Sequence, residues 1–112
     1  MDKGLYLKAQ SVAFTGHRTI PVPLQGEVRR RLKAAVSLAY ANGNRRFLCG
    51  MAIGFDSLAA EAVLSLKEDL PNIRLVAVVP FSGQACRWSA IERKRYHQLL
   101  SQADEVVVLS VN

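Results

Sequence analysis

The chain is 112 residues long, has a mass of 12.3 kDa and carries 15 Lys and Arg against 9 Asp and Glu, a net charge of +6. Half of its residues are apolar and 21% are charged, which excludes a disordered or low-complexity chain. A chain of this length buries roughly two-thirds of its surface on folding, so we expect a single domain over residues 1–112. The positive charge favours an anionic partner without choosing among nucleotide, nucleic acid and acidic protein.

Targeting signals and metal motifs are missing from the sequence. No apolar run approaches the ~18 residues that span a bilayer, and residues 1–10 lack the apolar stretch of a secretory signal. We therefore expect a cytoplasmic protein without membrane contact. Cys49 and Cys86 are too few for a disulfide framework and lack metal-ligand spacing, so we interpret both as reduced thiols and expect no metal.

Short apolar runs alternate with helical patterns along the chain. The runs at 11–15, 46–49, 74–79 and 105–109 predict four strands. Apolar residues recur at helical spacing over 24–39, from about 57 to before Pro71, and over 89–104. Ser89 and Glu92 have the spacing of a capping box at the start of the third helix. We expect that helix to turn Ile91, Leu99, Leu100 and Ala103 inward.

Strands joined by helical crossovers predict a mainly parallel sheet with right-handed connections. The fold class is therefore α/β, a Rossmann-like three-layer fold with about four strands and three helices. Its simplest strand order is 3-2-1-4, which places the first two helices on one face and the third on the other. One helix leaves apolar area uncovered on the second face, since parallel sheets are normally buried on both sides. We expect either a homo-oligomer through that face or a sheet edge, or the front part of a longer domain.

Unusual residues follow three of the predicted strands, where ligands bind in open parallel sheets. The glycine loop after the second strand is the most informative, because Gly50 and Gly54 flank the small Ala52 and lead into a helix. Glycines let backbone N–H groups approach an anion closely, and a helix N-terminus favours negative charge. The alternative is a tight turn whose glycines serve only packing. The loop is neither a Walker A motif nor a GxGxxG motif.

Four polar residues near these strand ends are open to two interpretations each. Arg18 can bind a phosphate through two charge-assisted hydrogen bonds, or it is a surface arginine that closes the first loop. Asp56 is either the N-cap of the second helix or a ligand of a ribose hydroxyl. Glu61 is either exposed or faces the crevice. His17 could be an acid–base group, but no carboxylate lies near it in sequence, so we interpret it as a hydrogen-bonding or structural residue.

Aromatic residues near the same edge could stack on a base. They are Phe81, Trp88 and Tyr96. Trp88 and Tyr96 could instead fasten the third helix to the sheet. Arg95, beside Tyr96, either reaches the crevice or extends a basic helix face.

Several separated motifs carry a resemblance that spans 11–109. They are Ala13-Phe14-Thr15-Gly16-His17-Arg18, Phe47 through Asp56 with Ala59-Ala60-Glu61, Val79-Pro80-Phe81 with Gln84 and Trp88, Arg95-Tyr96 and Ala103-Asp104. With these motifs the chain resembles the SLOG superfamily, in its YpsA-like branch. The glycine loop is also similar to that of the DprA proteins, whose Rossmann-like domain binds single-stranded DNA. The LOG phosphoribohydrolases, which split the N-glycosidic bond of nucleoside monophosphates, are more distant relatives.

The resemblance implies a Rossmann-like fold with a site for a nucleotide or nucleotide-derived ligand. Carried onto this sequence, the ligand-binding positions are Thr15, Gly16, His17, Arg18, Gly50, Met51, Gly54, Asp56 and Phe81. YpsA-like proteins usually continue through further strands with a second Gly-Gly-Thr segment, which is absent from this sequence. The resemblance therefore implies that the chain lacks the C-terminal part of the family domain.

Three functions follow as expectations. The first is binding of a nucleotide-type ligand at the carboxyl ends of the strands. The second is N-glycosidic hydrolysis of a nucleotide, with Glu61 or Asp56 as the catalytic carboxylate. The third is single-stranded DNA binding, favoured by the net charge and by Trp88 and Tyr96 near basic residues. Whether the chain is an enzyme stays open at this point.

Overall fold

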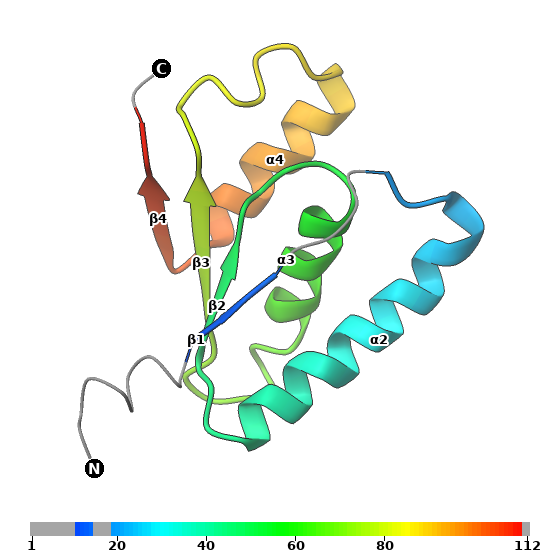
Figure 1. Ribbon diagram of the computed structural model, residues 1–112, viewed down its shortest axis with the longest axis vertical. Helices are drawn as coiled ribbons and strands as arrows, with labels where there is room; N and C mark the ends of the chain where they lie inside the picture. The colour runs from blue at the N-terminus through cyan, green and yellow to red at the C-terminus, as the bar shows by residue number, and fades with distance from the viewer. Residues whose placement is uncertain (1–10, 15–18, 111–112) are drawn as a thin grey trace.

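The computed structural model describes residues 11–14 and 19–110, which form alternating strands and helices (Figure 1). The strands are β1 (Ser11–Ala13), β2 (Arg46–Cys49), β3 (Arg74–Val79) and β4 (Glu105–Val108). The helices are α2 (Val22–Ala41), α3 (Phe55–Ser65) and α4 (Ala90–Gln102). The predicted α/β class, with four strands and three helices in these residues, is confirmed. None of the described helices combines the length and apolarity needed to cross a membrane.

Local signals explain where α4 begins. The capping box is present, because Glu92 N donates to Ser89 Oγ at 3.2 Å and Ser89 N donates to Glu92 Oε1 at 3.3 Å. Leu99 faces inward as predicted, and Leu100 and Ala103 pack against the core. The inward position predicted for Ile91 is wrong, since this side chain is 83% exposed. It lies in the first turn of α4, whereas the buried residues of this helix, Tyr96 and Leu99, come later.

The strand order is β1-β2-β3-β4, and each neighbouring pair is parallel. The predicted order 3-2-1-4 is wrong. Every crossover moves to the next strand in the same direction, and right-handed crossovers of this kind keep their helices on one face. The third helix therefore joins the other two instead of covering the opposite face: α3 packs against α2, α4, β2 and β3 (Figure 1). The described residues build two of the three expected layers.

The core lies between the sheet and the three helices. Alternation along the strands directs Phe47, Cys49, Leu75, Ala77 and Val79 to the helices, and all of them are buried. They form one cluster with residues of α2, α3 and α4, among them Leu32, Val36, Leu58, Ala59, Ala62, Val63, Tyr96 and Leu99. This packing holds the three helix N-termini at the carboxyl edge of the sheet.

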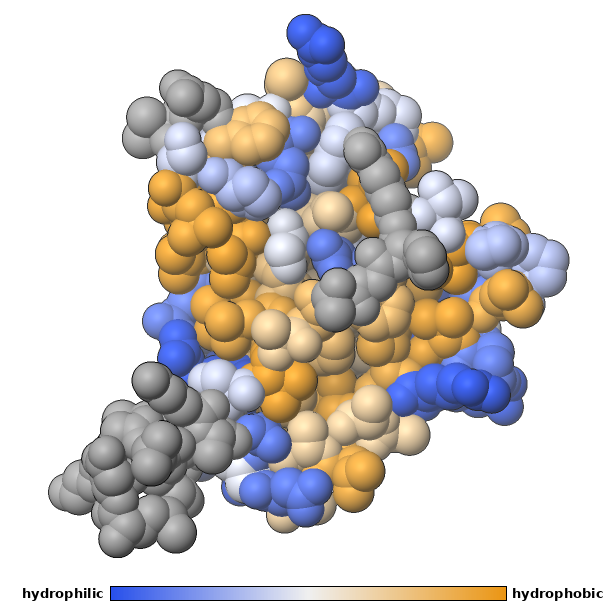
Figure 2. All heavy atoms as spheres, viewed as in Figure 1, coloured by the Kyte–Doolittle hydropathy of each residue, from blue (hydrophilic) through white to orange (hydrophobic). Residues whose placement is uncertain are grey.

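The opposite face of the sheet has no helix on it in the described residues. Leu48, Val78 and Val107 alternate onto this face, and Val107 is 41% exposed. Figure 2 shows the apolar side chains gathered over the strands in this view. The sequence predicts one helix on this face, whereas the described residues place none there. Burial of the face by a second copy stays a prediction.

Candidate functional site

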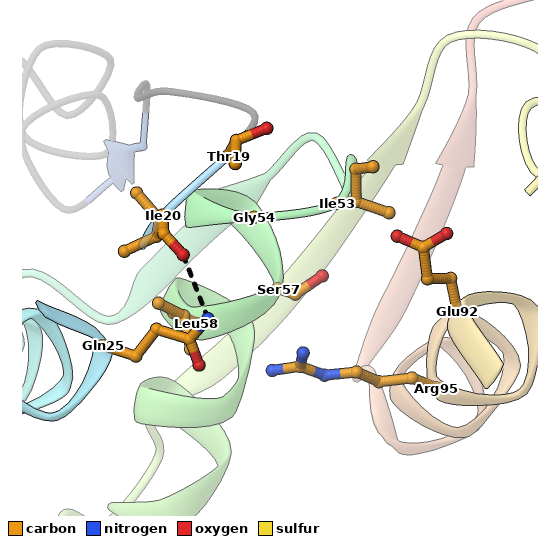
Figure 3. A pocket seen from close by; sticks show the side chains of 9 residues that line it. All are labelled: Thr19, Ile20, Gln25, Ile53, Gly54, Ser57, Leu58, Glu92 and Arg95. Carbon is orange, nitrogen blue, oxygen red and sulfur yellow. Dashed lines mark hydrogen bonds between the residues drawn. The ribbon is translucent and has the colours of Figure 1, made fainter. Parts of the chain in front are cut away.

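A pocket of about 210 Å³ lies where the N-terminal ends of α2, α3 and α4 meet (Figure 3). Each of these helices follows the carboxyl end of a strand, so the parallel sheet brings all three starts to one edge. The residues around the pocket are Thr19, Ile20, Gln25, Ile53, Gly54, Ser57, Leu58, Glu92 and Arg95. The pocket is therefore at the edge where the sequence predicts a ligand.

The glycine loop, residues 50–54, forms the wall of the pocket on the side of α3. Gly54 is the N-cap of α3 and has φ 82° and ψ −124°, a conformation that side chains with a Cβ rarely adopt. Gly54 also lines the pocket. Met51 has φ 63° and is buried. The loop is a tight turn at the N-terminus of α3. This geometry agrees with both interpretations of the sequence, an anion-binding loop and a turn whose glycines serve only packing.

The Asp56 carboxylate folds back onto the glycine loop. Ala52 N donates a hydrogen bond to Asp56 Oδ2 at 3.3 Å, and a Cβ added at Gly50 would lie 3.1 Å from the same oxygen. Burial raises the pKa of Asp56, and the hydrogen bond from Ala52 opposes that shift. The predicted N-cap role is wrong, because Gly54 is the N-cap and Asp56 lies in the first turn. Asp56 instead holds the loop closed from inside the helix.

Two further side chains fix the loop. Gln84 Nε2 donates to Met51 O at 2.9 Å and so connects the loop after β3 to the glycine loop. Ser57 Oγ donates to Ala52 O at 3.2 Å, and Ser57 is buried. The backbone of the loop is thus held from α3 on one side and from the β3–α4 connection on the other.

Arg95 brings a positive charge to the pocket. Its side chain extends from α4 towards α3 (Figure 3) and forms an ion pair with Glu61. Both side chains are 39% exposed. Arg95 lines the pocket, whereas Glu61 lies outside its lining and contacts the pocket through Arg95. In the structure Arg95 thus reaches the crevice, and Glu61 lies half-exposed beside it.

Other polar groups of the pocket are held by hydrogen bonds within the chain. Gln25 Nε2 donates to Ile20 O at 3.1 Å (Figure 3). The Glu92 carboxylate belongs to the capping box of α4. The lining thus combines one cation, one carboxylate, an amide and two hydroxyls with the apolar side chains of Ile20, Ile53 and Leu58.

The predicted ligand-binding residues differ in where they lie relative to the pocket. Gly54 lines the pocket, while Gly50, Met51 and Asp56 lie in the loop and the helix turn behind it. Phe81 is 40% exposed and is not among the lining residues. The remaining predicted residues lie outside the described part of the chain: Thr15, Gly16, His17 and Arg18.

The aromatic pair of α4 has a packing role. The rings of Trp88 and Tyr96 meet edge to face with centroids 5.2 Å apart, and Tyr96 is buried. Both residues contact the core. This arrangement matches the alternative in which they fasten the third helix to the sheet.

Metal and thiol chemistry have little support in the described residues. Within 11–14 and 19–110, no three His, Cys, Asp or Glu side chains are grouped so as to hold a metal ion. Burial, with a smaller contribution from the charge of Asp56, raises the pKa of Cys49 to about 12. Cys49 is therefore a protonated core residue, and Cys86 is an exposed free thiol.

Sequence reasoning missed Gln25, Ser57 and Glu92 as lining residues. Each is the third or fourth residue of its helix. Polar side chains in the first turn of a helix that follows a parallel strand lie at the ligand-binding edge. Their place in the first turn of a helix that follows a strand is the signal that could have identified them.

Comparison with known proteins identifies the family. The family model described as the YspA SLOG family, under the name YpsA, matches residues 23–112. A UPF0398 protein of Halalkalibacterium halodurans is 32% identical over 79 residues, which cover 70% of this chain and 42% of that protein. The SPbeta prophage-derived protein YoqJ of Bacillus subtilis is 31% identical over 86 residues, 76% of this chain and 50% of that protein. The chain thus spans about half the length of the curated relatives it matches, and it belongs to the YpsA branch of the SLOG family.

Proposed function

We propose that the chain binds a nucleotide or a nucleotide-derived ligand in the pocket at the carboxyl ends of the strands. The observation that carries the proposal is the position of Arg95 opposite Gly54, across a pocket at the N-terminus of α3. Membership of the SLOG family supports a nucleotide-related role.

The chemistry of the pocket suits a phosphate ester. A helix N-terminus and a guanidinium both favour an anion, and arginine can donate two parallel hydrogen bonds to a phosphate. Ile20, Ile53 and Leu58 offer apolar surface to a ribose or a base. The volume of about 210 Å³ is below the roughly 300–1,000 Å³ of typical small-molecule sites. We therefore expect the pocket to hold the phosphate end of the ligand rather than a whole nucleotide.

The two alternative functions have weaker support from the geometry. N-glycosidic hydrolysis needs a carboxylate at the reacting bond. Of the two predicted catalytic carboxylates, Asp56 is turned into the glycine loop and Glu61 is paired with Arg95, so neither lines the pocket. The carboxylate that does line it, Glu92, is held in the capping box of α4. Base stacking on single-stranded DNA needs several exposed aromatic faces. Tyr96 is buried and packs edge to face against Trp88, which leaves Phe81 as the exposed one of the three aromatic candidates.

A thermal-shift and calorimetric titration with nucleoside mono- and triphosphates, dinucleotides and nucleotide sugars tests the proposal. A ligand that binds only the folded state raises Tm once its concentration exceeds its Kd. We expect Arg95→Gln to weaken binding about tenfold or more. The matched control is Arg93→Gln, which removes the same charge from an exposed position of the same helix that does not line this pocket.

Two results would contradict the proposal. One is the absence of any Tm shift or binding heat from all four ligand classes at millimolar concentration with folded protein. The other is an equal loss of affinity in Arg95→Gln and Arg93→Gln, because a ligand in the pocket must distinguish the two arginines. Release of free base from a nucleoside monophosphate would instead revive the hydrolase alternative.

A further inference from the structure

A second cavity, of about 200 Å³, lies between α2 and α3. It is lined by Arg29, Lys33, Glu61, Ala62 and Ser65. We call it the α2–α3 groove. None of its residues lines the pocket described above, and none of its basic residues was placed at a ligand site by the sequence.

The basic residues of α2 divide into two pairs. Arg30 and Arg31 both form ion pairs with Glu27, and the bond from Arg31 Nε to Glu27 Oε1 is 2.9 Å. Arg29 and Lys33 lie four residues apart on one helix face and line the groove. Among the described residues, 11–14 and 19–110, neither of these two side chains has a hydrogen bond or an ion pair. The two charges facing the groove are therefore without a counter-ion from this part of the chain.

The carboxylate of the groove is already engaged. Glu61 lines the groove and forms its ion pair with Arg95, which lines the pocket. Glu61 therefore balances at most one of the three neighbouring cations. The region around it keeps a positive excess that Arg29, Lys33 and Arg95 share.

The groove continues from the pocket along the two helices. Gln25 lines the pocket, and Arg29 and Lys33 follow it at successive intervals of four residues on α2. On α3, Ser57 lines the pocket, and Glu61 and Ser65 follow at the same intervals. Four residues advance about 6 Å along a helix. A ligand anchored in the pocket thus needs to extend by only about one helical turn to bring a second group to Arg29.

We propose that the α2–α3 groove is an accessory anion site, and that the ligand carries a second phosphate group bound by Arg29 and Lys33. This inference rests on the proposed function, because the first phosphate of the same ligand occupies the pocket beside Arg95. The ligand class is thereby narrowed to nucleotides with two separated phosphates, or with a chain of phosphates, in preference to nucleoside monophosphates.

Calorimetric titration with paired probes tests the inference. The probes are adenosine and guanosine 5′-monophosphates, each compared with its 3′,5′-bisphosphate and its 5′-triphosphate. In the wild-type protein we expect a probe with more than one phosphate to bind at least tenfold more tightly than the monophosphate. In the double variant Arg29→Gln/Lys33→Gln that advantage falls to less than threefold, and monophosphate affinity changes by less than twofold.

The control variant is Arg30→Gln/Arg31→Gln, which removes two charges from the same helix. It is expected to retain the advantage of the bisphosphate or triphosphate. Equal losses in the two double variants would overturn the inference, since they would indicate only long-range attraction. Monophosphate binding without any gain from further phosphates would overturn it too and leave the proposed function standing. Failure of every probe to bind the wild-type protein would overturn both.

Discussion

The glycine loop and the pocket that it borders use their polar side chains differently. In the loop, Asp56, Ser57 and Gln84 form hydrogen bonds to backbone groups of residues 51–52. In the pocket, the charge of Arg95 is matched by another side chain, Glu61, and both partners are 39% exposed. Side chain to backbone bonds in a half-buried loop fix its conformation, whereas an exposed ion pair contributes only ~0–1 kcal/mol.

This contrast separates the residues that hold the scaffold together from those that can exchange one partner for another. A ligand phosphate can replace the Glu61 carboxylate at Arg95 while the backbone of α3 and α4 stays in place. It cannot replace the loop bonds without rebuilding the start of α3. Substitutions in the loop should therefore lower stability, and substitutions of the charged pair should act on ligand affinity.

The largest effect is expected at Gly54. Gly54→Ala places a Cβ on a backbone with φ 82°, which costs on the order of 1–3 kcal/mol. The matched control is Gly26→Ala in α2, where an added Cβ meets nothing within 4 Å and φ is not positive. That control should gain about 0.5–1 kcal/mol, because alanine is the better helix former. Equal changes in the free energy of unfolding, measured in guanidinium, would contradict this explanation.

The second-largest effect on stability is expected at Gly50, where the Cβ of a substituted alanine would lie 3.1 Å from Asp56 Oδ2. Gly50→Ala should destabilise the protein by about 1 kcal/mol, since close packing leaves little room for the carboxylate to move. In an Asp56→Ala background the same substitution should be neutral or stabilising. A double-mutant cycle of unfolding free energies measures this coupling, and strict additivity would show that the contact has no energetic effect.

Loss of the Gln84 amide should have a similar or smaller effect. Gln84→Ala removes the donor to Met51 O, which is worth about 1 kcal/mol. Gln102→Ala, at an exposed position near the end of α4, serves as the control and should change stability by less than about 0.5 kcal/mol. Hydrogen exchange at residues 51–54 gives a second readout. Unchanged protection there in Gln84→Ala would argue against the connection between the two loops.

The smallest effect is a pH dependence from Asp56. Burial raises the pKa of this carboxyl above its ordinary value of 3.8 in the folded state, so the folded chain binds its proton more tightly than the unfolded chain. The resulting stabilisation is fully present below pH 3.8 and is lost as the pH rises through the raised pKa. Asp56→Asn lacks this titration, so its stability relative to wild type should increase between pH 3.5 and 7. A constant or opposite difference in unfolding free energy would disprove the assignment.

The positions of individual strands and helices could be predicted from the sequence, whereas the order of the strands in the sheet could not. The strands at 46–49 and 74–79 have the predicted bounds, because uninterrupted apolar runs between breakers define buried strands. The capping box fixed the start of α4. The strand order was mispredicted, since a right-handed crossover can lead to a neighbour on either side of a strand.

The candidate site shows the same division. The glycine loop and its place at the strand ends follow from Gly50 and Gly54 in the sequence. α3 begins two residues earlier than predicted, because the positive φ of Gly54 sets its N-terminus there. The pairing of Arg95 with Glu61 joins residues 34 positions apart on different helices, and no local pattern specifies it.

The most direct test of nucleotide binding in the pocket is an NMR titration of the ¹⁵N-labelled protein with the nucleotide that gives the largest Tm shift. We predict the largest chemical-shift changes at the amides of Gly54, Ser57 and Leu58 and at Arg95 Nε, with Leu48, Val78 and Val107 on the opposite face of the sheet unchanged. If binding instead produces the largest chemical-shift changes at Leu48, Val78 and Val107, and none at the amides of the glycine loop, the assignment of the site is contradicted.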